Sequence, residues 1–245
     1  KKLNEGDSKI IHAEYYLGKL NSLLKSGAQT QKKRIRLLRK AARKSDYSYL
    51  RLLYKNFDRK ISTKGVSVII CCYNSSKLLP ETLHHLSLQK VRSYVRWEVI
   101  VVDNASTDNT EEVALKEWSR YKNCKGILRV VKQPIPGLSA AREKGIEESK
   151  YEYMVFCDDD NWLEKNYLQT VVSTMRVEKE IGIIGCETEE VCEVNPPDWF
   201  DKWKNWSYAV GEQFEKSGDI TWSRGFVWGE GMVLRRKALN QLYKE

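Results

Sequence analysis

The pattern of apolar and polar residues changes near residue 65 and divides the chain into two regions. In the first region apolar residues recur at helical spacing, with Ala13, Leu17 and Leu20 on one helix face, and Arg and Lys cover a second helical stretch. Beyond Val66, continuous apolar runs alternate with amphipathic stretches. We therefore expect a basic helical region over residues 1–60 and an α/β domain over residues 61–245.

The apolar runs of the second region are rich in β-branched residues, as in strands that are buried on both faces of a parallel sheet. Helix patterns follow the first four of them. Strands are predicted at 66–73, 97–103, 126–132, 151–157 and 181–187, and helices at 75–89, 106–121, 138–149 and 163–177. This alternation predicts a doubly wound, mostly parallel α/β sheet. The later segment "GFVWGEGMVLRR" predicts a strand or hairpin, followed by a helix from residue 235.

The two regions differ in charge, which suggests that they have different functions. Residues 1–60 hold 17 Lys and Arg against 5 Asp and Glu, whereas the remainder holds 25 against 28, so the helical region carries the whole excess of a chain whose net charge is +9. Its helices, over 8–60, are an ordinary appendage, dock on an anionic membrane surface, or bind a partner. They match no nucleic-acid recognition motif, so no nucleic-acid partner is expected.

Several observations bear on the compartment. No apolar run approaches the roughly 20 residues of a membrane span, and the start has no apolar stretch of a signal peptide. The six cysteines lack the paired spacing of a zinc site, which indicates reduced thiols. We expect a cytoplasmic protein, peripheral at the inner face of the membrane if its helices bind lipid. The chain lacks an initial Met and stops within a helix pattern, so we expect a fragment truncated at its C-terminal end.

Polar residues follow three of the predicted strands, where ligands bind in open α/β sheets. They are "CYNSS" after the first strand, "DNASTDNT" after the second and "CDDDN" after the fourth. Three consecutive carboxylates repel one another, so we expect a positive partner for Asp158, Asp159 and Asp160. On an extended backbone Asp158 and Asp160 would point to one side and Asp159 to the other.

A divalent cation is the partner that this composition favours. The sequence has no GxGxxG after a strand and no GxxxxGK[ST], which argues against dinucleotide oxidoreductases and P-loop kinases. Without such loops, diphosphate charge needs a cation held by carboxylates, and Mg²⁺ or Mn²⁺ takes one or two oxygens from protein.

Four blocks in this order, "VSVIICCYN", "EVIVVDNASTDNT", "GLSAAREKGI" and "VFCDDDN", resemble the family 2 glycosyltransferases of the GT-A fold. The resemblance covers about residues 65–235, and the ordered set is more specific than an isolated DxD. It implies an inverting enzyme that transfers a hexosyl group from a nucleotide-diphosphate donor, normally a UDP-sugar, to an acceptor hydroxyl. The acceptor would be a saccharide or a lipid-linked saccharide, in bacterial surface polysaccharide or glycoconjugate synthesis.

The resemblance also implies roles for individual residues. Asp160 would bind the divalent metal that bridges the donor diphosphate, and Asp158 would share the metal or approach the ribose. Asp103 would hydrogen-bond the donor base. The remaining donor contacts would be Tyr73 and Asn74 at the nucleoside and Arg142 beside the diphosphate.

The catalytic base and the acceptor site remain the least defined parts. The family takes its base from an acidic motif after a "WGxGM" segment, and here the chain ends soon after "WGEGM". Glu230 is the only acidic residue near that segment, so the base is Glu230 or, as we favour, lies beyond Glu245. Trp228 would contact the acceptor. The other tryptophans of residues 199–228 either stack on the acceptor sugar or, as we slightly favour, pack a small core against the sheet.

Two alternatives to an active transferase stay open. One is a catalytically inactive module that binds sugar nucleotides and acts through its N-terminal helices. The other is a sugar-nucleotide pyrophosphorylase, although the glycine-rich signature of that class is absent.

Overall fold

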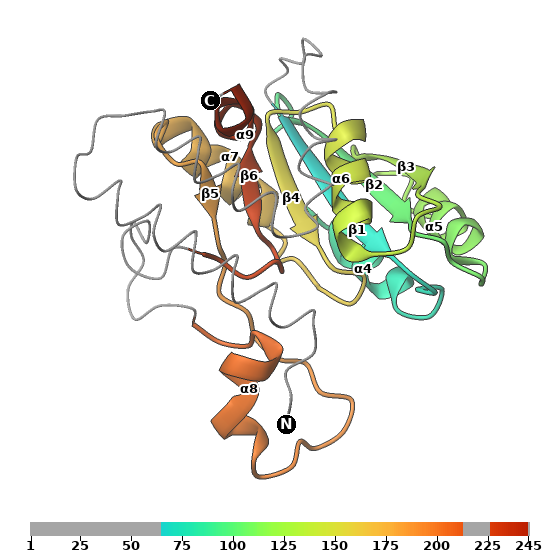
Figure 1. Ribbon diagram of the computed structural model, residues 1–245. Helices are drawn as coiled ribbons and strands as arrows, with labels where there is room; N and C mark the ends of the chain where they lie inside the picture. Colours follow the sequence, from blue (N-terminus) through green and yellow to red (C-terminus); the bar gives the residue numbers. More distant parts are fainter. Residues whose placement is uncertain (1–64, 213–225, 245) are drawn as a thin grey trace. The chain divides into compact units, whose positions relative to one another are not determined.

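A six-stranded sheet forms the centre of the computed structural model, which describes residues 65–212 and 226–244 (Figure 1). The strand order is β3-β2-β1-β4-β6-β5. The strands are β1 (Gly65–Cys72), β2 (Arg96–Asp103), β3 (Ile127–Lys132), β4 (Tyr153–Cys157), β5 (Ile183–Ile184) and β6 (Val233–Arg235). The helices expected within residues 1–60 lie outside the described residues, so their prediction is not tested.

The first four strands run parallel, and their register aligns the strand ends. Cys72 of β1 pairs with Asp103 of β2, which in turn pairs with Lys132 of β3. On the other side of β1, Ile70 pairs with Cys157 of β4. The segments that leave β1, β2 and β4 therefore start at the same edge of the sheet.

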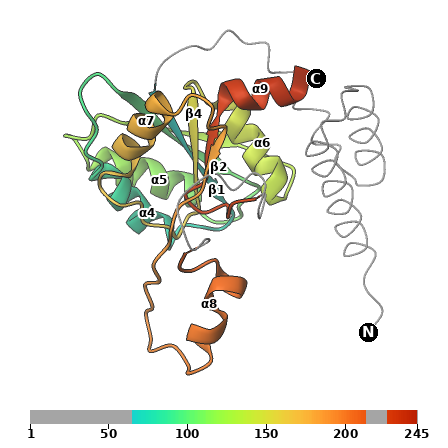
Figure 2. The same ribbon diagram turned by 90° about the vertical axis from the view of Figure 1, so that its left-hand side faces the viewer.

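Helices cover both faces of this sheet. In the view of Figure 2, α4, α5 and α7 lie on one side of the sheet and α6 and α9 on the other. The helices are α4 (Leu79–Ser87), α5 (Thr110–Ser119), α6 (Leu138–Glu148), α7 (Tyr167–Val177), α8 (Phe200–Tyr208) and α9 (Arg236–Lys244). Among the described residues, no helix is long and apolar enough to cross a membrane.

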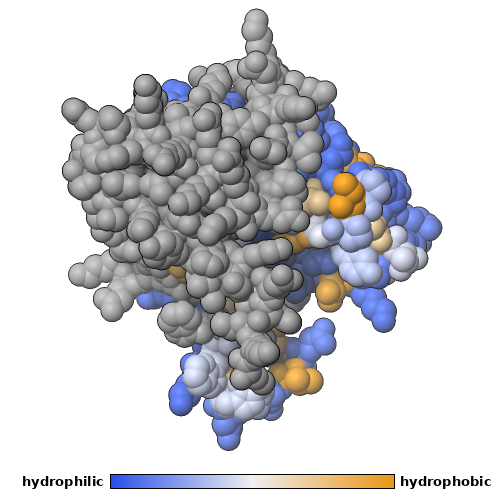
Figure 3. All heavy atoms as spheres, viewed as in Figure 1, coloured by the Kyte–Doolittle hydropathy of each residue, from blue (hydrophilic) through white to orange (hydrophobic). Residues whose placement is uncertain are grey.

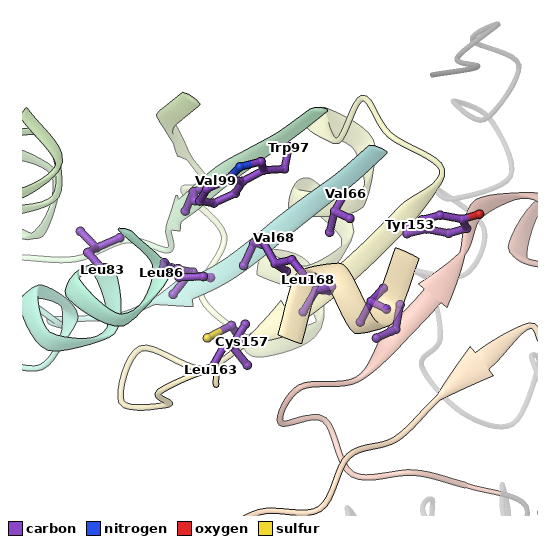
Figure 4. Packing of buried hydrophobic residues seen from close by; sticks show 14 of the residues in the cluster. Val66, Val68, Leu83, Leu86, Trp97, Val99, Tyr153, Cys157, Leu163 and Leu168 are labelled. Carbon is purple, nitrogen blue, oxygen red and sulfur yellow. The ribbon is translucent and has the colours of Figure 1, made fainter. Parts of the chain in front are cut away.

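The main core lies between the sheet and helices α4 and α7. Val66 and Val68 of β1 point to this side and meet Leu83 and Leu86 of α4 and Leu168 of α7 (Figure 4). These side chains are almost completely buried. Because side chains alternate along a strand, the intervening residues of β1 face α6 instead.

Helix α6 approaches the other face closely because it carries Gly145. A Cβ atom built at Gly145 would collide with the side chain of Ile69 in β1 and would press on Val102 in β2. A glycine at this position thus lets the helix backbone lie directly on the sheet.

The structure shortens two predicted strands. The expected strand over 181–187 is only Ile183–Ile184, and the late strand is Val233–Arg235, antiparallel to both of its neighbours. The turn before β6 contains Gly231 in the left-handed region, with φ 65°, which ends any extended run through "WGEGM". The six cysteines are free thiols, with Cys157 buried and Cys71 half-buried.

Candidate active site

The polar residues that follow the parallel strands meet at one edge of the sheet. Asp103 is the last residue of β2, and Tyr73 and Asp158 follow β1 and β4 directly. This is the edge at which open α/β sheets bind ligands. The convergence predicted from the sequence is therefore present in the structure.

Asp158 to Asp160 form a turn, not the extended segment that the sequence analysis assumed. The Asn161 amide donates to the Asp158 carbonyl at 3.2 Å, and the Asn161 side-chain oxygen accepts from the Asp158 amide at 3.3 Å. The alternation of side chains expected from a strand was therefore wrong here. Neither the Asp158 nor the Asp160 carboxylate receives a hydrogen bond from a residue within 65–212 or 226–244.

The charges of this turn are only partly offset by neighbouring groups of the protein. Burial raises the pKa of Asp158, the guanidinium of Arg142 opposes that rise, and the charges of Asp160 and Asp159 add to it. Burial and Asp160 likewise raise the pKa of Asp159. Such a cluster favours a bound cation, because each carboxylate disfavours ionisation of the next.

Arg142 lies beside this turn and belongs to α6. Its guanidinium carbon is 5.5 Å from the centre of the Phe156 ring in β4. A Cβ atom at Gly229 would collide with the same guanidinium, so the glycine leaves room for it. The sequence analysis placed Arg142 beside the donor diphosphate, and that contact stays a prediction.

Glu230 completes the group from the far end of the chain. Burial, followed by the charges of Asp158 and Asp160, raises its pKa to about 7. Its loop is fixed by two side chains, because the Cys186 thiol donates to the Glu230 carbonyl at 3.0 Å and the Tyr167 hydroxyl donates to the Gly231 carbonyl. A carboxylate with this pKa can accept a proton at neutral pH.

Asp103 is buried but is already paired. The Lys132 ammonium donates to one carboxylate oxygen at 2.6 Å, and the Ser106 amide donates to the other at 3.2 Å. Burial raises the pKa of Asp103, but these hydrogen bonds outweigh it, so the pKa lies below its ordinary value. Lys132 also pairs with Glu111 at 2.6 Å. The sequence analysis did not select Lys132, although its place at the end of a predicted strand beside Asp103 was a usable signal.

Asn74 organises the neighbouring loop. Its side-chain oxygen accepts from the amides of Thr107 and Asp108 at 2.8 and 3.3 Å, and its own backbone has a positive φ of 55°. Asp108, which was not predicted, accepts from Ser76 and Thr110. Burial raises the pKa of Asp108, but the hydrogen bonds from Thr110 and Ser76 together outweigh this effect and lower the pKa to about 2. Tyr73 is 62% exposed, so its ring is open to a ligand.

The tryptophan segment differs from its prediction. Trp199 and Trp203 at α8 are 51% and 49% exposed, so the expectation that they pack a core against the sheet was wrong for them. Figure 3 shows the part around α8 at the bottom of the view, mostly in blue and pale colours with a small orange group. Trp228 is partly buried next to the Glu230 loop, and its contact with an acceptor stays a prediction.

The described residues fit a divalent cation only in part. No group of three or more His, Cys, Asp or Glu within them is arranged to hold a metal ion. Asp158 and Asp160 nevertheless offer hard oxygen ligands that receive no hydrogen bond from the described residues. This donor set suits Mg²⁺ or Mn²⁺ that takes its other ligands from phosphate and water.

Known proteins match this chain in both sequence and fold. The family model described as "Glycosyl transferase family 2" matches residues 67–243. Cholesterol galactosyltransferase of Borreliella burgdorferi is 31% identical over 113 residues, which cover 46% of this chain and 30% of that protein. Chondroitin synthase of Escherichia coli is 31% identical over 129 residues, covering 52% and 18%. The chain thus spans less than a third of the length of either relative.

Solved structures show the fold. TarS 1–349 of S. aureus has a TM-score of 0.54 and 22% identity, with 73% of this chain and 49% of that chain covered. The mannosyltransferase PcManGT of Pyrobaculum calidifontis has a TM-score of 0.50 and 22% identity, with 79% and 53% covered. The predicted α/β architecture with a mostly parallel sheet is confirmed.

Proposed function

The chain belongs to the family 2 glycosyltransferases, and from this membership we propose that it transfers a sugar from a nucleotide-diphosphate donor to the hydroxyl of a saccharide acceptor. The resemblance read from the sequence is thereby confirmed, together with the GT-A type of fold. Membership counts against a pyrophosphorylase. The donor, the metal, the acceptor and the roles of single residues are parts of the proposal.

One observation carries the proposal: carboxylates at the end of β4 lie beside the guanidinium of Arg142 from α6. The carboxylates of Asp158 and Asp160 receive no hydrogen bond from residues 65–212 or 226–244, and Arg142 lies close enough to lower the pKa of Asp158. A donor diphosphate brings negative charge, so it needs a cation between itself and the aspartates. We assign Asp160, assisted by Asp158, to Mn²⁺ or Mg²⁺, and Arg142 to the diphosphate.

The metal, when bound, acts as a Lewis acid that stabilises the departing diphosphate. Glu230 would accept the proton of the acceptor hydroxyl, since its pKa of about 7 suits a general base at neutral pH. The hydroxyl would attack opposite the leaving group and invert the anomeric centre. Asp103, Tyr73 and Asn74 would orient the nucleoside, the last through the loop that it holds.

The nature of the donor and acceptor follows from the relatives only as a proposal. TarS of S. aureus has been solved with UDP and with UDP-GlcNAc, and PcManGT with GDP-Man and Mn²⁺. These structures support a UDP-sugar with a divalent metal as the first choice and a GDP-sugar as the second. The name of the E. coli chondroitin synthase supports polysaccharide synthesis.

Calorimetric titration of UDP, with and without Mn²⁺, tests the donor site. We expect Mn²⁺ to strengthen UDP binding and Asp160→Asn to weaken the metal-dependent complex by at least about tenfold. Glu180→Gln, at an exposed acidic position, serves as the matched control. If UDP fails to bind, GDP and dTDP follow; failure of all three nucleotides would refute the proposal.

Transfer assays then separate an enzyme from an inactive binding module. With UDP-sugars and oligosaccharide acceptors, Glu230→Gln is expected to lower kcat by about 100-fold or more while leaving the Kd for UDP within about twofold. Normal turnover of this variant would instead show that Glu230 is not the catalytic base.

Membrane contact through residues 8–60, and with it a place at the inner face of the membrane, is a further part of the proposal. The net charge of +12 in residues 1–60 supports it. Co-sedimentation with phosphatidylserine vesicles is expected for the whole chain and not for residues 61–245. Equal sedimentation of the two would refute it.

A further inference from the structure

Helix α4 carries one polar residue on its buried face. Leu79, Leu83 and Leu86 line that face, and Thr82 lies among them with no exposed surface. The Thr82 hydroxyl donates to the carbonyl of Asp159 at 2.7 Å, across 77 positions of sequence. A hydroxyl in such a place would cost stability without a partner, and its partner is the backbone of the aspartate turn.

Gln89, just beyond the end of α4, binds the segment that follows that turn. The Gln89 side chain donates to the carbonyls of Leu163 and Glu164 at 3.2 and 2.7 Å, and it accepts from the Leu168 amide at 3.1 Å. These bonds fix the segment that leads into α7. Of the α4 side chains, Thr82 is the one whose hydrogen bond reaches the aspartate turn itself.

An aromatic contact continues this attachment to α4. The rings of His85 and Trp162 are stacked, with centres 4.9 Å apart and planes 5° from parallel. Trp162 comes directly after Asn161, which closes the turn by its bonds to Asp158. The turn is thus held by α4 on both sides of Asp160.

Hydrogen bonds hold the backbone of the aspartate turn but not its side chains. The backbone is fixed by Thr82 and Asn161, whereas the carboxylates of Asp158 and Asp160 receive no hydrogen bond from any described residue. A rigid backbone with unengaged carboxylates is the arrangement of a preorganised ligand site, because little has to be rearranged or displaced when a cation binds.

We propose that Thr82 is a positioning residue, which acts through the Asp159 carbonyl to hold the aspartate turn in the geometry that binds a divalent cation together with a nucleoside diphosphate. The proposal rests on the proposed function, because it takes the turn to be the metal-binding element. Thr82 itself touches neither metal nor nucleotide. Its effect is on the cation and not on the nucleoside.

The test compares Thr82→Val, which keeps the shape and removes the hydroxyl, with Thr82→Ser, which keeps the hydroxyl. Electron paramagnetic resonance counts free Mn²⁺ in the presence of saturating UDP, and calorimetry gives the Kd for UDP without metal. For Thr82→Val we expect the Kd for Mn²⁺ to rise about five- to tenfold, the effect of one lost hydrogen bond, and the metal-free Kd for UDP to stay within about twofold. Thr82→Ser should restore Mn²⁺ binding to within about twofold of wild type.

Ser87→Ala is the matched control, since that hydroxyl donates to the His84 carbonyl of its own helix at 2.7 Å and this hydrogen bond is exposed. Unfolding temperatures without ligand show whether each variant is folded, and Thr82→Ala replaces the valine variant if that one is not. Unchanged Mn²⁺ binding in Thr82→Val or Thr82→Ala overturns the inference. An equal loss of metal-free UDP binding also overturns it, as does a Thr82→Ser variant that does not restore Mn²⁺ binding. Wild-type protein that binds no UDP with Mn²⁺ overturns the proposed function as well, and so the two failures are distinguishable.

Discussion

The ionisation of the single residue Glu230 makes the stability of the folded chain depend on pH. Burial and the charges of Asp158 and Asp160 raise its pKa from 4.5 to about 7 in the folded chain. Between about pH 4.5 and pH 7, Glu230 is therefore protonated in the folded state and ionised in the unfolded state. The stabilising contribution is complete below about pH 4.5 and is lost as the pH rises through about 7.

We therefore predict that metal-free wild-type protein loses thermal stability relative to Glu230→Gln as the pH rises from about 5 to 8. Glutamine mimics the protonated carboxyl and cannot ionise, so its curve serves as the reference. Thermal unfolding in EDTA at each pH measures the difference in Tm. A difference that stays constant over this range would show that Glu230 has an ordinary pKa.

Tyr167 acts at the junction of two elements, since it begins α7 and its hydroxyl donates to the Gly231 carbonyl. Tyr167→Phe keeps the ring and removes this bond, so we predict a loss of about 1 kcal/mol in the free energy of unfolding, or about 2–4 °C in Tm. Differential scanning calorimetry measures it. Tyr208→Phe, at a half-exposed position of α8, should leave Tm unchanged, and an equal shift in both variants would contradict the assignment.

The contact of α6 with the sheet gives a prediction for a whole element. Gly145→Ala places a methyl group against Ile69, whose colliding atom is on the stiff Cβ branch. We expect a loss of about 1–3 kcal/mol in the free energy of unfolding, measured by urea denaturation. Ser139→Ala, on the exposed side of the same helix, should change it by less than about 0.5 kcal/mol. Wild-type stability in the glycine variant would show that the helix can move away.

The sequence predicts elements better than it predicts the partners of side chains. Buried parallel strands leave continuous apolar runs, so β1, β2, β3 and β4 were found within about two residues of their bounds. The two-residue β5 and three-residue β6 are set by pairing with distant strands, which local sequence does not encode. Asp103 and Asp158 were found because they follow strands directly, whereas the hydrogen bonds of Thr82 and Lys132 span 77 and 29 positions.

At the scale of the whole molecule, β6 joins the late part of the chain to the sheet. It pairs antiparallel with β4. Its Arg235 side chain donates to the carbonyl of Met175 in the last turn of α7 and to the carbonyls of Glu178 and Ile181, which follow that helix. A chain that ends at Glu212 would lack all of these bonds. It would also leave β4 with an open edge, which favours association between chains.

We predict that such a shortened chain has a Tm at least about 5 °C below that of the whole chain and forms aggregates. Size-exclusion chromatography with light scattering, combined with thermal unfolding, checks both properties against the whole chain under the same conditions. A monomeric shortened chain of equal Tm would mean that the first four strands form a self-sufficient domain.

The late position of β6 also matters while the chain is being synthesised. The ribosome releases β1 to β4 and the aspartate turn first, and Glu230 follows 69 residues after Asn161. At ordinary elongation rates this interval lasts roughly 3–14 s. During this interval the β4 edge of the nascent sheet is unpaired, so it is a site at which a chaperone would prevent association. The negatively charged aspartate turn is also made before Glu230, the carboxylate that later lies beside it.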